Sequence, residues 1–146
     1  FKTYCATTMA ALEGMKRKNH GRIINVSSSS VKEPLQNLVL SNTVRAAVVN
    51  WTKSLAGEIA PYGITINNIL TGSFDTERLK SLHRQQAENK GMDLEAWRKE
   101  TAEKIPMKRF GKPKEYAYLA AFLASDYAAY ITGASIPIDG GAMKSV

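Results

Sequence analysis

Residues 21–28 read GRIINVSS, and this short stretch decides the fold class. Its β-branched residues lie between a glycine and a run of serines, a pattern typical of a short strand that is buried on both faces. In residues 3–18, immediately upstream, Met9, Leu12 and Met15 follow a three- and four-residue spacing, which predicts an amphipathic helix that ends just before the strand. A helix joined tightly to a buried strand is typical of α/β proteins.

Helices and strands continue to alternate in the downstream sequence. Residues 41–60 carry apolar side chains on one helical stripe and predict a helix of about five turns, followed by a glycine that is available for a left-handed cap. Residues 64–70, ITINNIL, predict a second strand. Residues 113–126 predict a third long helix that begins with proline, and residues 134–142 a last short strand with a glycine turn. Strands that alternate with long helices pair in parallel through right-handed crossovers.

Residues 75–104 interrupt this alternation, because they are polar and helix-prone with a break near Gly91. Asp75 or Thr76 is a candidate N-cap for a first short helix and Asp93 for a second. We expect a helical excursion on the surface that covers a substrate. The chain shows no repeats and no internal boundary, so residues 1–146 are predicted to form a single domain.

Composition excludes several function classes. The formal net charge is +7, but the positive residues are scattered except for one cluster at 15–22 that suits a solvated helix end, so we expect no nucleic acid partner. No apolar run is long enough to span a membrane, and none is expected to bind one. Cys5 is the only cysteine, which indicates a reducing, cytoplasmic location. The two histidines lack nearby carboxylates at ligand spacing, so we expect no metal site. His83 lies in the excursion at 75–104, where it could contact a substrate, but a lone histidine on a polar helix is usually solvated, and we expect that here.

Four segments together resemble the C-terminal half of the short-chain dehydrogenase/reductase family, in particular its 3-oxoacyl-[acyl carrier protein] reductase-like members. They are residues 21–28, 45–69, 71–76 and 109–141. The resemblance implies a Rossmann-type parallel sheet with flanking helices, in which the three predicted strands are the last three of seven. The half that would bind the adenosine of NAD or NADP is absent, and the opening residues FKTYCATT read as the interior of a longer protein.

The resemblance also implies a catalytic set. In the family, a serine at the end of the fifth strand orients the substrate carbonyl. A tyrosine 13 residues later transfers the proton, and a lysine four residues after that lowers the tyrosine pKa and holds the nicotinamide ribose. Ser28 matches the serine, and the same spacings lead to Ser41 and Arg45, so the tyrosine has become serine and the lysine arginine. Gly72 and Thr76 match family positions that contact the cofactor.

The two exchanges bear directly on the chemistry. Carbonyl reduction needs a general acid with a pKa near the working pH; tyrosine, near 10, can be brought down, whereas an aliphatic hydroxyl at about 15–16 cannot. Ser41 is therefore a poor acid, and Arg45 keeps the charge of lysine but not its geometry. Without the resemblance, Ser41 is a candidate helix N-cap and Arg45 a surface cation. The sequence identifies no tyrosine as a replacement acid.

Two functions remain open at this stage. The first is an NAD(P)-dependent oxidoreductase that transfers a hydride between nicotinamide and a carbonyl or hydroxyl substrate, possibly of 3-oxoacyl type. The second is an impaired family member that binds a dinucleotide or an acyl group and forms oligomers. In either case we expect a small-molecule ligand and a homo-oligomer, dimer or tetramer, assembled through the helix at 41–60 and the C-terminal helix and strand.

Overall fold

The computed structural model describes residues 1–145, and its elements confirm the predicted alternation. The long elements are α1 (Lys2–Lys18), β1 (Gly21–Ser28), α2 (Val39–Ile59), β2 (Ile64–Thr71), α3 (Glu77–Asn89), α4 (Leu94–Glu103), α5 (Pro113–Ala124) and β3 (Ser135–Ile138). Three 3-10 turns join them, η1 (Ser29–Val31), η2 (Ala60–Tyr62) and η3 (Asp126–Ala128).

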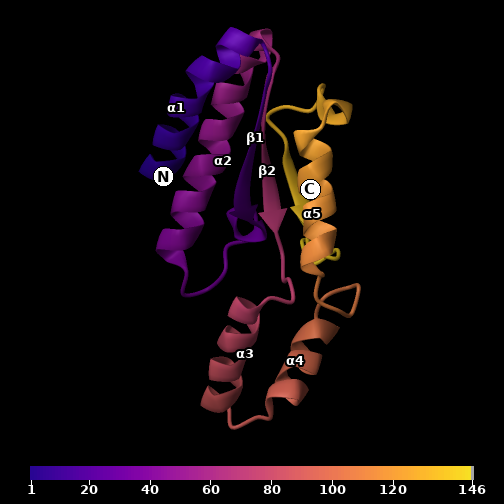
Figure 1. The fold of residues 1–146 in the computed structure, drawn as a ribbon. Helices are drawn as coiled ribbons and strands as arrows, with labels where there is room; N and C mark the ends of the chain where they lie inside the picture. Colours follow the sequence, from indigo (N-terminus) through magenta and orange to yellow (C-terminus); the bar gives the residue numbers. More distant parts are fainter. Residues whose placement is uncertain (146) are drawn as a thin grey trace.

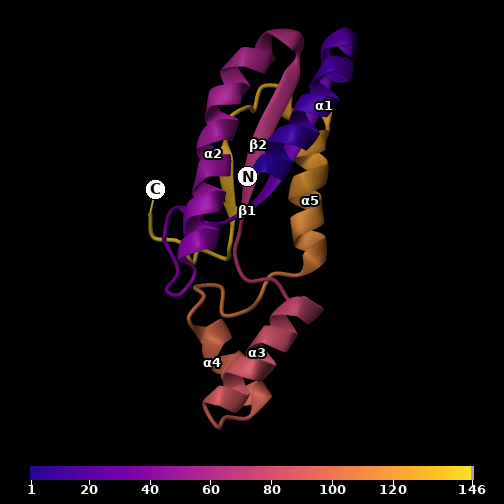
Figure 2. The same cartoon turned by 90° about the vertical axis from the view of Figure 1, so that its left-hand side faces the viewer.

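The three strands form one parallel sheet in the order β1-β2-β3. Gly21 lies opposite Ile64 and the register continues to Ser28 opposite Thr71, so β1 and β2 end together. Helices α1 and α2 cover one face of the sheet and α5 covers the other (Figure 1), and the turned view shows α1 and α2 side by side (Figure 2). The predicted α/β class with a helix-flanked parallel sheet is confirmed.

Successive side chains of a strand point to opposite faces of the sheet, so the hydrophobic core has two parts, one on each face. Ile23 packs with Leu12 of α1 and Leu55 of α2 in one cluster, while its neighbour Ile24 packs with Leu123 of α5 in another. The central strand β2 is buried along nearly its whole length, because it is flanked on both edges and both faces.

The outer edge of β1 is less protected. Among residues 1–145 no strand pairs with β1 on the side away from β2, and the Val26 side chain is 52% exposed. Tyr4 of α1 reaches this edge, since its hydroxyl donates a hydrogen bond of 2.9 Å to the Val26 carbonyl.

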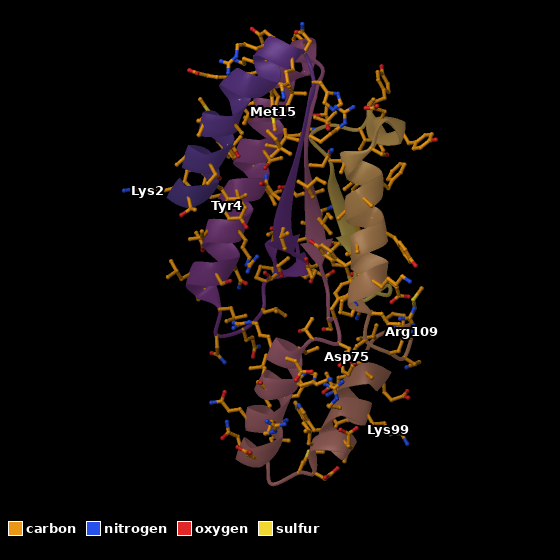
Figure 3. All side chains as sticks on the ribbon, viewed as in Figure 1. Lys2, Tyr4, Met15, Asp75, Lys99 and Arg109 are labelled. Carbon is orange, nitrogen blue, oxygen red and sulfur yellow. The ribbon has the colours of Figure 1, made fainter. Side chains whose placement is uncertain are left out.

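The polar residues 75–104 form the predicted pair of short helices, α3 and α4, which extend as a hairpin beyond the carboxyl ends of the strands (Figure 1). Thr76 and Asp93 cap them, as predicted, and Asp75 instead accepts a hydrogen bond from Arg98 at 2.7 Å. Asp75 and Arg109 mark the level at which the hairpin joins the body (Figure 3).

His83 corrects an expectation. The side chain is not solvated but 4% exposed, because the hairpin packs its imidazole against the Phe110 ring at 5.3 Å. Burial, reinforced by the charge of Arg98 and opposed by that of Asp75, lowers the pKa of His83 below its ordinary value.

Candidate active site

The carboxyl ends of β1 and β2 lie next to two separate hollows. Parallel sheets of this kind bind ligands at the carboxyl ends of their strands, so this edge is where a site is expected. The first hollow lies between α1, β1 and α2, has a volume of about 240 Å³, and is called the α2 hollow below. The second, of about 300 Å³, opens past the ends of the strands and is called the strand-end hollow.

Ser41 and Arg45 lie together in the α2 hollow. Arg45 donates from Nε to the Ser41 hydroxyl oxygen at 3.3 Å, one helical turn away. Helix α2 begins at Val39 with Leu38 as its N-cap, so Ser41 lies inside the helix and the N-cap alternative is wrong. Arg45 is half-buried and its Nη groups make no hydrogen bond within residues 1–145, which leaves them free for a ligand.

Ser27 completes the polar lining of the α2 hollow. The residue is 4% exposed, and its hydroxyl has no hydrogen-bond partner among residues 1–145. A buried hydroxyl without a partner costs about 1–3 kcal/mol, so it marks a place where water or a ligand group binds. The hollow thus combines the cation of Arg45 with the hydroxyl groups of Ser27 and Ser41. These groups can hydrogen-bond to the hydroxyl groups of a ribose, so the residues present fit the sugar of a nicotinamide cofactor.

Ser28 lies in the strand-end hollow instead. Successive strand residues point to opposite faces, and Asn25 hydrogen-bonds to Thr52 of α2, so Ser27 shares the α2 face while Ser28 faces away. The Ser28 oxygen accepts from the backbone N–H of Ser30 at 3.1 Å. The structure therefore brings Ser41 and Arg45 together but places Ser28 in a separate hollow.

Gly72 and Thr76 each have a structural role. Gly72 lines the strand-end hollow with Ser28 and Thr71, and a Cβ on it would lie 2.6 Å from the Asp139 Cα. Only glycine fits this close approach. The Thr76 hydroxyl accepts from the Leu79 N–H at 3.2 Å and caps α3.

The C-terminal tail closes the strand-end hollow. Glu33, in the loop after β1, accepts hydrogen bonds from the backbone N–H groups of Lys144 at 2.6 Å and Ser145 at 2.8 Å. These bonds lower the pKa of the Glu33 carboxyl below its ordinary value. Leu35 and Met143 supply apolar lining beside several hydroxyl groups, so this hollow suits a small ligand with both polar and apolar parts.

A third hollow, of about 370 Å³, lies behind the end of β3 and has fewer polar groups available to bind a ligand. Its charged groups already have partners. Arg109 donates to Glu115 through two hydrogen bonds of 2.7 and 2.8 Å, and these bonds, with one from the Lys112 N–H, lower the pKa of Glu115 to about 2. Asp139 accepts from the backbone N–H groups of Gly141 and Met143. Within residues 1–145 no cluster of three or more potential metal ligands occurs, and no helix is both long and apolar enough to cross a membrane.

Sequence reasoning missed two residues of the α2 hollow. Ser27 could have been found from the two-residue period of the strand, which places it on the face of Asn25. Tyr4 shares the helical stripe of the buried residues Thr8 and Leu12, and this spacing indicates that it faces the sheet. Its position beside Ser41 depends on packing between segments far apart in the sequence.

The fold and the site define a class, the α/β proteins with a polar site at the carboxyl ends of parallel strands. A family model described as enoyl-(acyl carrier protein) reductase matches residues 1–143, and the chain belongs to this family of short-chain dehydrogenases/reductases. The resemblance inferred from the sequence is thereby confirmed.

Known proteins with similar sequences are reductases. The chain is 39% identical over 132 residues to the NADPH-dependent reductase BacG of Bacillus subtilis, covering 90% of this chain and 51% of the relative. It is 39% identical over 134 residues to the 3-oxoacyl-[acyl-carrier-protein] reductase FabG of Vibrio cholerae, covering 90% and 50%. The chain thus spans about half the length of the curated relatives it matches.

Solved structures agree in fold. YwfH, an NADPH-dependent reductase involved in bacilysin biosynthesis, superposes with a TM-score of 0.89 at 39% identity, covering 98% of this chain and 55% of that one. Actinorhodin polyketide ketoreductase, solved with NADPH, superposes with a TM-score of 0.84 at 26% identity, covering 90% and 51%.

Proposed function

We propose that this chain is the substrate-binding half of an NADPH-dependent oxidoreductase that transfers a hydride between nicotinamide and a carbonyl or hydroxyl substrate. The observation that carries the proposal is the α2 hollow, which is lined by a half-buried cation whose Nη groups make no hydrogen bond within residues 1–145 and by a buried hydroxyl that likewise has no partner there. The family match and the NADPH dependence of its relatives support the choice of cofactor.

Each site residue has a proposed role. Arg45 holds the nicotinamide ribose through its free Nη donors, with Ser41 and Ser27 lining the same hollow. Ser28 orients the substrate carbonyl by donating a hydrogen bond to its oxygen, while Gly72 and Thr76 contact the cofactor through the strand-end loop. When bound, the reduced nicotinamide supplies the hydride.

A substrate of 3-oxoacyl type is consistent with the strand-end hollow, which offers apolar lining from Leu35 and Met143 beside the Ser28 hydroxyl. The hairpin α3–α4 lies beyond the same edge, and we propose that it covers the substrate. Residues 1–146 then form one unit, the C-terminal part of a Rossmann-fold reductase.

Assembly and location complete the proposal. A homo-oligomer, dimer or tetramer, is supported by the exposed aromatic side chains of α5 and η3, among them Tyr118, Phe122 and Tyr127. The unpaired Cys5 supports a reducing, cytoplasmic location.

A second candidate function is a binding protein without turnover, and one observation favours it. Ser41 replaces the expected acid with a far weaker one, and its oxygen already accepts from Arg45. Such a protein would bind the dinucleotide or an acyl group and form the same oligomers, but it would not reduce a substrate.

The experiment is performed on the full-length protein. NADPH binding is followed by nucleotide fluorescence, and NADPH oxidation by absorbance with 3-oxoacyl thioesters and simple ketones. We expect Arg45→Ala to weaken NADPH binding about tenfold, as expected for one lost charge-assisted contact. The matched control is Arg84→Ala, since Arg84 is an exposed arginine on α3. Absence of NADPH binding contradicts the oxidoreductase and leaves only an acyl-binding protein, whereas NADPH binding without any oxidation favours the second function.

A further inference from the structure

We propose that Met143 limits the size of the group that a ligand can carry beside its carbonyl, and that Glu33 positions Met143 for this role. The inference rests on the proposed function and deepens it, since it names a specificity residue of the strand-end hollow. Ser28 and Met143 line this hollow together, so a polar group for the carbonyl and an apolar wall for its substituent lie in one place.

The segment after β3 crosses the carboxyl edge of the sheet. It starts at the end of β3, where the Gly72 N–H donates to the Ile138 carbonyl at 3.1 Å, and it reaches Glu33 in the loop after β1. Figure 2 shows this segment, in yellow, beside the loop that follows β1. Because β1 and β3 are the two edges of the sheet, the segment passes over the strand ends, where parallel sheets bind their ligands.

Two carboxylates hold the backbone on either side of the Met143 side chain. Asp139, just after β3, accepts from the Met143 N–H at 2.8 Å. Glu33 accepts from the N–H groups of the next two residues, Lys144 at 2.6 Å and Ser145 at 2.8 Å. Hydrogen bonds to an ionised group are roughly twice as strong as neutral ones. The position of Met143 is therefore fixed from both sides.

Among the apolar side chains of the hollow, Met143 is the one that can restrict a ligand. It is half-buried, whereas Leu35 is 55% exposed and has room to move aside, and Ala142 is small and exposed. A bulky ligand that displaced Met143 would also have to disturb the contacts of both carboxylates.

The Ser28 hydroxyl indicates where the carbonyl binds. Its oxygen accepts from the Ser30 N–H at 3.1 Å, and within residues 1–145 it donates to no group, so its proton is available to a carbonyl oxygen. The hollow has a volume of about 300 Å³, which is at the lower limit for small-molecule sites. The ligand class that fits is a ketone or 3-oxo ester with a small substituent toward Met143.

The test uses the full-length protein and two 3-oxo esters that differ only in the group beyond the ketone, methyl in one and phenyl in the other. Titration calorimetry gives the Kd of each ester, and we expect the unmodified protein to bind the methyl compound more tightly. Met143→Ala should shift the ratio of the two Kd values toward the phenyl ester by about tenfold or more, the effect of a few methylene-sized groups in an apolar pocket. With NADPH present, the ratio of the kcat/KM values should shift in the same direction.

Two variants serve as controls. Met143→Leu nearly conserves the volume of the side chain and should keep the selectivity. Met9→Ala should also keep it, because Met9 is 57% exposed on α1. The ratio compares two ligands of one protein, so a change in stability alone does not alter it.

Glu33 is tested as a positioning residue. Glu33→Gln weakens the hold on the backbone after Met143, and we expect the ratio to shift in the same direction as in the Met143→Ala protein. Added to Met143→Ala, the same substitution should have no further effect, since Glu33 acts through Met143. Equal shifts in the two backgrounds would overturn the positioning role.

Failure of this inference differs from failure of the proposed function. Unchanged selectivity in the Met143→Ala protein overturns the inference, and so does an unmodified protein that binds neither ester or prefers the phenyl ester. If NADPH is still oxidised in any of these cases, the oxidoreductase function stands. A protein that selects the methyl ester through Met143 and never binds NADPH supports the inference and contradicts the oxidoreductase.

Discussion

Asn25 and Asn68 lie opposite each other on β1 and β2, and both side-chain amides meet at the hydroxyl of Thr52 on α2. Asn25 donates to Thr52 at 2.9 Å, and Thr52 donates to Asn68 at 3.0 Å. All three residues are buried, so this network fixes α2 against the sheet directly beneath the α2 hollow.

Replacing Thr52 by valine keeps the shape of the side chain and removes the shared hydroxyl. Two buried amides then lose a partner, and we expect the free energy of unfolding to fall by about 1–3 kcal/mol in denaturant titrations. Thr43→Val is the control on the same helix, because Thr43 is exposed. Equal stabilities of the two variants would show that the network contributes nothing.

Gly72→Ala should lower the stability of the fold, whether or not a ligand is bound. The added Cβ would lie 2.6 Å from the Asp139 Cα and 3.2 Å from the Ile138 carbonyl oxygen, so backbone must move, at a cost of about 1–3 kcal/mol. Gly57→Ala offers the contrast, since nothing lies within 4 Å of its added Cβ on α2 and alanine favours a helix by about 1 kcal/mol. Thermal unfolding of the two variants should shift in opposite directions.

The α3–α4 hairpin should loosen in mild acid. The pKa of His83 is lowered in the folded protein, so the unfolded chain binds more protons below the ordinary value of 6.5. The stabilisation by neutral His83 is complete above that value and declines as pH falls below it toward the folded pKa. Amide hydrogen exchange in α3 and α4, measured at pH 7.5 and 5.5, should show the loss of protection.

The two histidines of the chain allow a matched comparison. His83→Gln should flatten the pH dependence of hairpin protection, whereas His20→Gln should preserve it, because the His20 side chain is 57% exposed and lies elsewhere. A hairpin whose protection is the same at both pH values in the unmodified protein would contradict the assignment.

Glu33→Gln should release the C-terminal tail. A neutral amide oxygen is a weaker acceptor for the backbone N–H groups of Lys144 and Ser145 than the carboxylate that holds them. We expect these two amides to exchange faster, with Glu13→Gln on the exposed face of α1 as control. Because the pKa of Glu33 is lowered, the contact should persist down to its ordinary value of 4.5 and be lost at more acidic pH.

Local sequence signals predicted most of the fold. The isoleucines of 21–28 and 64–70 predicted both long strands, and the proline at 113 predicted the start of α5, which ends two residues before the predicted limit. Gly63 is left-handed, as predicted, but it caps the 3-10 turn η2 and not α2, which ends at Ile59. The start of α2 was placed two residues late, at Ser41, because Val39 and Leu40 are exposed apolar residues that carry no capping signal.

The site was harder to predict, for a physical reason. Ser41 and Arg45 are one turn apart on a single helix, so their spacing already implied their contact. The separation of Ser27 from Ser28, and the arrival of Tyr4 beside Ser41, depend on how α1 and α2 pack on the sheet, which no local pattern encodes.

The unpaired side of β1 also has a practical consequence. Within residues 1–145 no strand covers the outer edge of the eight-residue strand β1, so its backbone is a template onto which a strand of another molecule can add, and the exposed Val26 offers an apolar contact there. At high concentration, this polypeptide alone is expected to self-associate through that edge. Tyr4 protects only one carbonyl of it, that of Val26, by donating a hydrogen bond.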